Sequence, residues 1–328
     1  MKYRRLGRTG FNVSILSLGS GGPNQFGQLR YVSRENIHRL VRRALDLGMN
    51  YFDTAAGYAE SESMLGEGLH GVPRDQYYLA SKLFPLKRNR FLSPAEARQL
   101  VERSLRRLRV DSLDILYLHR IVPQRYPETL ERLLPLLLDL RAEGKIRCIG
   151  ISESSKHDRQ HDMLRRALED DRFDAVMVAY EIARGGAEKE ILPMALARDV
   201  GVVGMVAARN LVHRTAGERL KLSAAALLSL MKSPPRPGLA ALRLREALSP
   251  LRRSGPSAAL SMPRQGGAGV LQLPAAGYTF AVSHPAVATV LTGTTNPGHL
   301  EQNVQAALAP ALTAGEIAAL RELLRRPG

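Results

Sequence analysis

The chain contains a single cysteine, Cys148, among 328 residues. An internal disulfide is therefore impossible, and so little cysteine is typical of proteins in a reducing compartment. No stretch approaches the roughly 18–20 consecutive apolar residues that a membrane-spanning helix requires. No apolar run follows the basic start Met1-Lys2-Tyr3-Arg4-Arg5 either. We therefore expect neither a secretory signal nor a membrane association, and we expect a cytoplasmic location.

Negative charge is scarce: 31 Asp and Glu stand against 47 Lys and Arg, which gives a net charge of +16. Such a balance occurs in nucleic-acid-binding proteins, and it also helps to attract an anionic dinucleotide. Here the arginines are scattered over helix-like segments, and aromatic residues do not alternate with them as they do in single-strand binders. We interpret the charge as solvated helix faces and expect no nucleic-acid partner. Binding that weakens steeply with salt would indicate the alternative.

Short apolar runs alternate with amphipathic helical stretches, a pattern that predicts a parallel sheet with crossover helices. A chain of this length with eight such units predicts one α/β domain over residues 1–328, a (β/α)8 TIM barrel. The predicted strands are Ile15–Gly19, Tyr51–Asp53, Tyr78–Lys82, Ile115–His119, Cys148–Ser152, Ala175–Ala179, Val202–Val206 and Val287–Leu291.

Several segments mark the boundaries of elements. Tyr3–Leu6 and Phe11–Ser14 flank a Gly-Arg-Thr-Gly turn and predict a β-hairpin ahead of the barrel. Ser93-Pro94-Ala95-Glu96 is a capping box with proline at the first helical position. Ser33 can cap the first helix, and Gly48 stands where a left-handed residue would end it.

A long insertion between the seventh and eighth strands, roughly Ala208–Ala276, interrupts the alternation. Its middle, Leu220–Leu230, has a helical pattern, whereas the flanks are rich in Pro and Gly. A long loop at the mouth of a barrel is often a lid or a specificity element, and an insertion without a role is the alternative. Because such loops set specificity, the sequence leaves the physiological substrate, the reaction direction and the oligomeric state open.

Four polar residues lie at or just after three neighbouring predicted strand ends: Asp53, Tyr58, Lys82 and His119. Catalytic groups of such barrels lie at the carboxyl ends of the strands. Singly, each residue has a structural explanation, such as a helix cap or a packed amphipathic side chain. Together, at matched strand ends, they predict one site, and we expect no metal in it.

These four residue types suit carbonyl reduction, which needs a hydride and a proton. A cofactor supplies the hydride. Tyr58 can supply the proton if a nearby ammonium, that of Lys82, stabilises tyrosinate and lowers its pKa from about 10. Asp53 can pair with the lysine, and His119 can donate a hydrogen bond to the developing alkoxide.

Longer motifs surround these residues. They are YFDTAAGYAESE at Tyr51–Glu62, Ser81-Lys82, DSLDILYLH at Asp111–His119, KIRCIGIS at Lys145–Ser152 and GTTNPGHLEQN at Gly293–Asn303. Together they resemble the motifs of the aldo-keto reductase family over most of the chain, from about Tyr3 to Asn303. The resemblance implies a nicotinamide-dependent oxidoreductase with Asp53, Tyr58, Lys82 and His119 as catalytic residues and Tyr58 as acid/base.

The resemblance also implies where a cofactor binds. NADP(H) is favoured over NAD(H), extended across the barrel mouth, with a small aldehyde, ketone or alcohol as substrate. Ser152 stands where it could bind the nicotinamide carboxamide, and the turn and helix from Gly293 offer donors to the adenosine phosphate. The implied cofactor residues are Ser20, Ser152, Glu153, Met177, Met205, Gly293, Thr294, Thr295, His299, Gln302 and Asn303.

The sequence departs from the family pattern around the nicotinamide. The family usually has Asn at Glu153, Gln at Met177, Tyr at Met205 and Ser at Val206. Lys and Arg, frequent in members that bind a 2′-phosphate, are replaced by Gly293 and His299, although His299 or Arg264 could compensate. The intact set of four catalytic residues argues against a degenerate site, but the departures leave open a second hypothesis, a cofactor-binding regulatory or accessory protein with a reductase-like barrel and little turnover.

Overall fold

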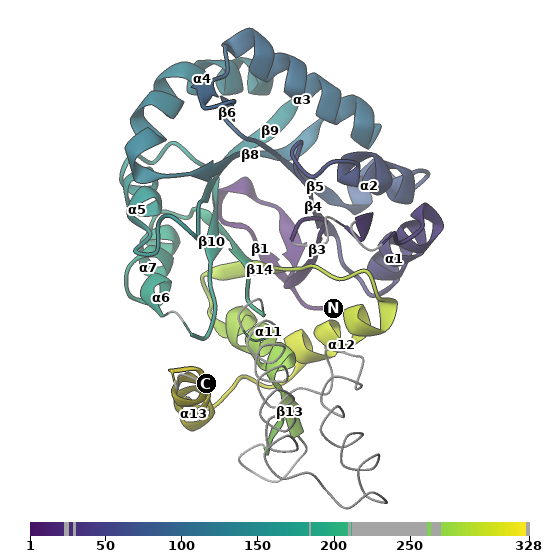
Figure 1. The fold of residues 1–328 in the computed structure, drawn as a ribbon, viewed down its shortest axis with the longest axis vertical. Coiled ribbons are helices and arrows are strands. Elements are labelled where there is room, and N and C mark those ends of the chain that lie inside the picture. Colours follow the sequence, from purple (N-terminus) through teal and green to yellow (C-terminus); the bar gives the residue numbers. More distant parts are fainter. Residues whose placement is uncertain are drawn as a thin grey trace, which may run out of the picture.

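A computed structural model of the chain describes residues 1–22, 26–28, 31–183, 185–208, 211, 261–263 and 270–325. Its centre is a closed barrel of parallel strands in the order β10-β11-β14-β3-β4-β5-β8-β9 (Figure 1). The strands are β3 (Leu16–Gly19), β4 (Tyr51–Asp53), β5 (Tyr78–Leu83), β8 (Leu113–Ile121), β9 (Ile146–Glu153), β10 (Ala175–Ala179), β11 (Gly201–Met205) and β14 (Val287–Thr292). This barrel confirms the predicted (β/α)8 fold, with every predicted barrel strand found close to its expected place.

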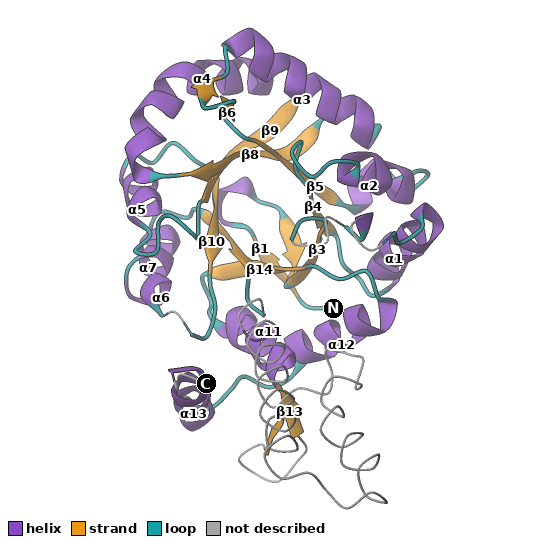
Figure 2. Cartoon of the chain, in the orientation of Figure 1, coloured by secondary structure: helices purple, strands orange, loops and turns teal. Residues whose placement is uncertain are grey.

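Helices surround the barrel from outside, as Figure 2 shows. They are α1 (Arg34–Asp46), α2 (Ser61–Leu69), α3 (Pro94–Leu108), α4 (Tyr126–Ala142), α5 (Asp162–Glu169), α6 (Gly186–Lys189), α7 (Ile191–Ala197), α11 (Leu273–Ser283), α12 (Pro297–Leu308) and α13 (Ala314–Arg325). A strand covered on both faces must be apolar throughout, and β10, Ala-Val-Met-Val-Ala, is buried at every residue. None of the helices in the described ranges is long and apolar enough to cross a membrane.

The predicted N-terminal hairpin is present and closes one end of the barrel. β1 (Tyr3–Arg5) pairs antiparallel with β2 (Asn12–Ser14). Leu6, Phe11 and Val13 are buried in a cluster with residues that line the barrel interior. The amino ends of the strands are therefore filled by apolar side chains, and the carboxyl ends form the mouth.

The predicted helix boundaries are confirmed. The Ser93 hydroxyl accepts a hydrogen bond from Glu96 N–H, and the Glu96 carboxylate accepts one from Ser93 N–H, which completes the capping box before α3. Ser33 caps α1 by accepting from the N–H of Asn36. Gly48, just beyond the end of α1, has a φ of 81°, the left-handed conformation that glycine adopts without strain.

The seventh strand ends earlier than predicted. Val206 has a φ of 63°, so it cannot continue β11, and a β-branched residue seldom adopts this conformation. Two short hairpins were not predicted: β6 (Leu86–Lys87) with β7 (Arg90–Phe91), and β12 (Ser261–Pro263) with β13 (Val270–Gln272).

Most of the predicted insertion, Ala208–Ala276, lies outside the described residues, as do Leu220–Leu230 and Arg264. Its described parts are Ala208, Leu211, the hairpin β12–β13 and the start of α11. A role for the insertion as a lid stays a prediction.

Candidate active site

The fold brings the four predicted catalytic residues together at the barrel mouth. Asp53 is the last residue of β4, Lys82 is the next to last of β5, and His119 lies near the end of β8. Tyr58 follows β4 in the turn before α2. Because all barrel strands run in one direction, their carboxyl ends share one rim. Residues at the ends of β4, β5 and β8 and in the loop after β4 therefore form a single cluster.

An ion pair lies at the base of this cluster. Lys82 Nζ donates to Asp53 Oδ2 at 2.5 Å and to the carbonyl oxygen of Thr54 at 2.7 Å. The side chains of Lys82 and Asp53 are only 1% and 3% exposed. A buried ammonium needs such partners, since an unpaired charge in this position would be strongly destabilising.

The ion pair keeps Lys82 charged. Burial alone would lower the pKa of Lys82, but the carboxylate of Asp53 and the hydroxyl of Tyr58 outweigh it, and the pKa lies above its ordinary value. Lys82 is therefore an ammonium at neutral pH.

The Tyr58 ring lies between Lys82 and His119. Lys82 Nζ is 5.1 Å from the ring centroid of Tyr58, and the His119 ring meets the Tyr58 ring edge to face, with centroids 5.7 Å apart. On another side lies Gly21, where an added Cβ would come within 2.7 Å of a Tyr58 ring carbon and 3.0 Å of the hydroxyl oxygen. The backbone at Gly21 therefore packs directly against the phenol.

His119 is neutral in this environment. It is 9% exposed, and burial, followed by the positive charges of Lys82 and Arg120, holds its pKa well below the ordinary value. A neutral imidazole can donate one hydrogen bond without bringing a second positive charge next to Lys82. This suits a group that orients an oxygen atom rather than one that transfers a proton.

Buried polar atoms without a hydrogen-bond partner gather at the same end of the barrel. Within the described residues they include Ser20 Oγ, Asp53 Oδ1 and Thr54 Oγ1, from the ends of β3 and β4. Such atoms are rare in folded proteins and are often found at functional sites. Ser20 was predicted as a cofactor residue; the structure places it beside Asp53, whose carbonyl oxygen accepts from Ser20 N–H at 2.8 Å.

The opposite side of the mouth, formed by β9, β10 and β11, is arranged differently. The side chain of Glu153 is fully buried, and both of its carboxylate oxygens are engaged, one with the N–H of Ala179 at 2.6 Å and the other with His161 Nδ1 at 2.7 Å. Met177 is 1% exposed and belongs to the apolar cluster inside the barrel, and Met205 packs against that cluster. The Glu153 carboxylate is thus engaged within the protein, and Met177 belongs to the apolar barrel interior. Ser152 directly precedes Glu153 on β9 and is 2% exposed.

The predicted cofactor residues near the C-terminus lie along the loop after β14 and the first turns of α12. They are Gly293, Thr294, Thr295, His299, Gln302 and Asn303. Asn303 Nδ2 donates to Thr292 Oγ1 at 2.9 Å, which holds α12 against the end of β14. In the part of the chain that the structure describes, the side chains of Thr295, His299 and Gln302 make no hydrogen bond or ion pair and so remain available to a ligand.

Three contributors to the mouth were not named individually as site residues from the sequence, although Gly21–Leu29 was a candidate specificity loop. Gly21 packs on Tyr58, and the sequence signal was the Gly21-Gly22 pair directly after a strand. Gln28 Nε2 donates to the carbonyl oxygen of Tyr58 at 3.2 Å, and Gln28 Oε1 accepts from Glu60 N–H at 3.0 Å. His161 pairs with Glu153, a contact that no local pattern indicates.

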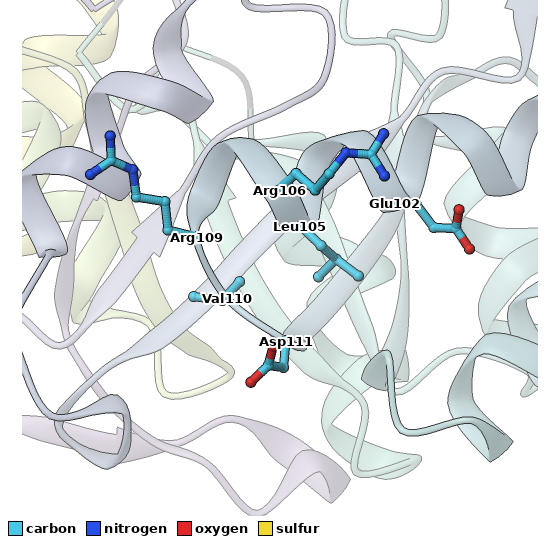
Figure 3. A pocket seen from close by; sticks show the side chains of 6 residues that line it. All are labelled: Glu102, Leu105, Arg106, Arg109, Val110 and Asp111. Atoms are coloured by element: carbon cyan, nitrogen blue, oxygen red, sulfur yellow. The ribbon is translucent and has the colours of Figure 1, made fainter.

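Two surface pockets outside the mouth do not involve the predicted residues. One, of about 370 Å³, lies at the end of α3, and Figure 3 shows the side chains that line it, among them Glu102, Arg106 and Arg109. A second, of about 670 Å³, lies along α4 and α5. The first belongs to the amino end of the barrel, since α3 leads into the start of β8. No cluster of His, Cys, Asp and Glu in the described ranges could hold a metal ion.

Comparison with known proteins agrees with this geometry. The model of the Aldo/keto reductase family matches residues 17–219, more than half of the chain, and the chain belongs to that family. An L-galactose dehydrogenase of Arabidopsis thaliana is 36% identical over 157 residues, which cover 46% of this chain and 48% of that protein. An NADH-specific methylglyoxal reductase of Escherichia coli (strain K12) is 33% identical over 227 residues, 63% of this chain and 66% of that protein. The chain thus spans about half to two thirds of these relatives.

Solved structures share the whole barrel. An aldo-keto reductase from Bacillus halodurans, in its holo form, matches with a TM-score of 0.67 and 25% identity over 98% of this chain and 96% of that one. An aldo-keto reductase from Klebsiella pneumoniae in complex with NADPH has a TM-score of 0.64 at 22% identity, over 99% and 96% of the two chains. These likenesses extend over both halves of the barrel.

Proposed function

We propose that the protein is an oxidoreductase that interconverts a small aldehyde or ketone and its alcohol with a nicotinamide cofactor, with Tyr58 as the acid/base. The observation that carries the proposal is the buried Lys82 ammonium. It is held charged by Asp53 and lies 5.1 Å from the Tyr58 ring centroid. The named activities of the relatives, a dehydrogenase and a reductase, are of this class.

The donors at the mouth fit a dinucleotide. Gly293 lies beside the loop after β3, since a Cβ there would be 3.8 Å from the carbonyl oxygen of Gly19. The hydroxyl of Thr295, the imidazole of His299 and the amide of Gln302 offer hydrogen bonds to ribose and phosphate. Ser20 and Ser152 would hold the nicotinamide end, and Met205, at the end of β11, would offer an apolar surface. The bound nicotinamide would give or accept the hydride.

The chain's own residues would handle the proton. In the direction of reduction, the Tyr58 hydroxyl gives its proton to the substrate oxygen, and the Lys82 ammonium stabilises the phenolate that remains. Asp53 keeps Lys82 charged and in place. The neutral imidazole of His119 donates a hydrogen bond to the same substrate oxygen and orients it. In the direction of oxidation, the phenolate takes the proton back.

The preference for NADP(H) over NAD(H) stays a prediction. Thr295, His299 and Gln302 carry no permanent positive charge, and Arg43, close by on α1, is paired with Glu301 of α12 at 2.8 Å. A 2′-phosphate would therefore depend on neutral hydrogen-bond donors more than on an arginine fork. Parallel titrations with NADPH and NADH test the preference.

A regulatory protein with little turnover is the second candidate. The observation that favours it is the β9–β11 side of the mouth, where the Glu153 carboxylate is fully engaged and Met177 is buried. Such a protein would oxidise bound cofactor once, slowly, without steady-state turnover.

The deciding experiment follows nicotinamide fluorescence while purified protein is titrated with NADPH and, separately, with NADH. A reactive aldehyde such as 4-nitrobenzaldehyde is then added. We expect saturable binding followed by aldehyde-dependent oxidation over many turnovers. Binding with a single slow turnover would favour the regulatory protein, and no binding of either cofactor would contradict both candidates.

A further inference from the structure

β9 ends in a buried carboxylate that the catalytic cluster does not use. Glu153 Oε1 accepts the N–H of Ala179, the last residue of β10, at 2.6 Å. Glu153 Oε2 lies 2.7 Å from Nδ1 of His161, the residue directly before α5. One carboxylate thus joins the ends of two neighbouring strands to the start of a helix.

The Glu153 carboxylate connects β9 to β10 just beyond the point where their backbone pairing ends. Pairing of β9 with β10 ends at Ser152 opposite Met177, and the next connection between the two strands is the Glu153 side chain on Ala179. On its other side, the backbone of Glu153 pairs with Ile121 of β8. Glu153 therefore fixes the end of β9 from both sides at the rim of the mouth.

His161 is buried, as is its partner Glu153. It is 4% exposed, and its φ of 62° is left-handed. Its ring lies 3.5 Å from where a Cβ on Gly186 would be. Burial raises the pKa of Glu153, while the hydrogen bond and charge of His161 oppose that rise. A carboxyl group this deep is stabilised by the hydrogen bonds that both of its oxygens make, and removing one partner leaves a costly unsatisfied polar group.

Ser152, immediately before this pair, has a nearly free hydroxyl. Among the residues that the structure describes, its Oγ contacts only the carbonyl oxygen of Glu153, at 3.5 Å, at the outer limit for a hydrogen bond. The direction of the hydroxyl therefore depends on how the backbone at the end of β9 is held. That backbone is held by the contacts of Glu153.

We propose that Glu153 and His161 are positioning residues that aim the Ser152 hydroxyl at the bound nicotinamide. The inference rests on the proposed function, in which Ser152 holds the nicotinamide end. Glu153 acts through β9 rather than by touching the cofactor, because both of its oxygens are engaged within the protein. Glu153 and His161 thus orient the Ser152 hydroxyl on the side of the mouth opposite the catalytic cluster.

The test is a double-mutant cycle in cofactor affinity, with Glu153→Gln, Ser152→Ala and the double variant. The Kd of NADPH and of NADH is measured by nicotinamide fluorescence, and Tm is measured on the same samples. The amide oxygen of the introduced glutamine can still accept from Ala179, so the change removes mainly the charge. We expect Glu153→Gln to weaken binding about tenfold when Ser152 is present and less than about twofold when residue 152 is alanine, since residues acting through one contact are not additive.

His161→Asn provides a second variant in the same cycle. The amide nitrogen of the introduced asparagine replaces His161 Nδ1 at a similar place as a neutral donor, and asparagine tolerates the left-handed backbone. We expect a smaller loss of affinity than with Glu153→Gln, again only when Ser152 is present. If Glu153→Gln does not fold, this variant carries the test.

Asp114→Asn is the matched control for a general loss of stability. Asp114 is also a fully buried carboxylate, paired with Arg74 and Arg147 at the opposite end of β8. We expect it to lower Tm without changing either Kd. Equal losses of affinity with and without Ser152, or a lower Tm with unchanged affinity in Glu153→Gln, would overturn the positioning role. Failure of the wild-type protein to bind either cofactor would instead contradict the proposed function itself.

Discussion

The two sides of the barrel mouth use buried charge in different ways. On the β4–β5–β8 side, Lys82 and Asp53 form a buried ion pair. The Lys82 Nζ of this pair lies 5.1 Å from the centroid of the Tyr58 ring. On the β9–β10 side, Glu153 and His161 form a pair of similar length and burial, but it faces the protein interior and the next helix. The partner of Asp53 lies beside the Tyr58 ring, whereas the partner of Glu153 lies at the start of α5. The two acidic residues at strand ends therefore differ in what their partners contact.

The difference assigns the two sides different tasks. On the first side the Lys82 ammonium lies 5.1 Å from the centroid of the Tyr58 ring, and the proposed task of this side is proton transfer. On the second side, Glu153 and His161 join strand ends and fix the position of the backbone. The proposed task of this side is therefore to orient a ligand. Variants on each side should therefore change different properties of the protein.

The largest effect is expected from Asp53→Asn, which leaves Lys82 buried without a charged partner. Unfolding by urea should show a loss of about 3–5 kcal/mol in the free energy of unfolding, and turnover should be lost because the lysine then sheds its proton more readily. Glu153→Gln, the equivalent change on the other side, should retain turnover at saturating cofactor. A stable and active Asp53→Asn variant would show that the two pairs do not differ in function.

A smaller effect is expected from Gly21→Ala. The added methyl would lie 2.7 Å from the Tyr58 ring and must displace it, and a misplacement of this kind costs of the order of 100-fold in kcat. Gly57→Ala is the matched control, because a Cβ at Gly57, one residue before Tyr58, has no neighbour within 4 Å. Equal kcat values for the two variants would contradict the packing of Gly21 on the phenol.

The smallest effect is expected in the pH dependence of stability. Burial keeps the pKa of His119 well below 6.5 in the folded protein, so below about pH 6.5 the unfolded chain binds a proton that the folded protein does not. Stability therefore falls as pH falls through this range. His119→Gln should make the decline in Tm between about pH 7.5 and 5.5 shallower than in the wild type. An identical slope would mean that His119 is protonated in the fold.

The barrel and the grouping of Asp53, Tyr58, Lys82 and His119 at its mouth could be predicted because their signals are local. Asp53 and Lys82 each stand at the end of an apolar run, and the parallel topology alone brings such ends together. The capping box at Ser93 likewise involves only residues within one turn. These features need no knowledge of distant contacts.

The remaining features depend on contacts between separate loops. Gly21 and Tyr58 meet across two β–loop units, and nothing in either segment specifies the other. Position alone assigned Glu153 to the cofactor, whereas the structure turns its carboxylate to His161. The prediction of strand residues as far as Val206 was wrong, because its positive φ follows from packing at the end of β11 and not from its β-branched side chain.

The most direct test of the central claim is the turnover of Tyr58→Phe with a reactive aldehyde, measured beside the Kd of NADPH and NADH. The change removes one oxygen atom and leaves the ring between Lys82 and His119. If Tyr58 transfers the proton, kcat falls by about 10²–10⁴-fold while both Kd values stay within about twofold of the wild type. Turnover close to the wild-type rate would contradict the assignment of Tyr58 as acid/base.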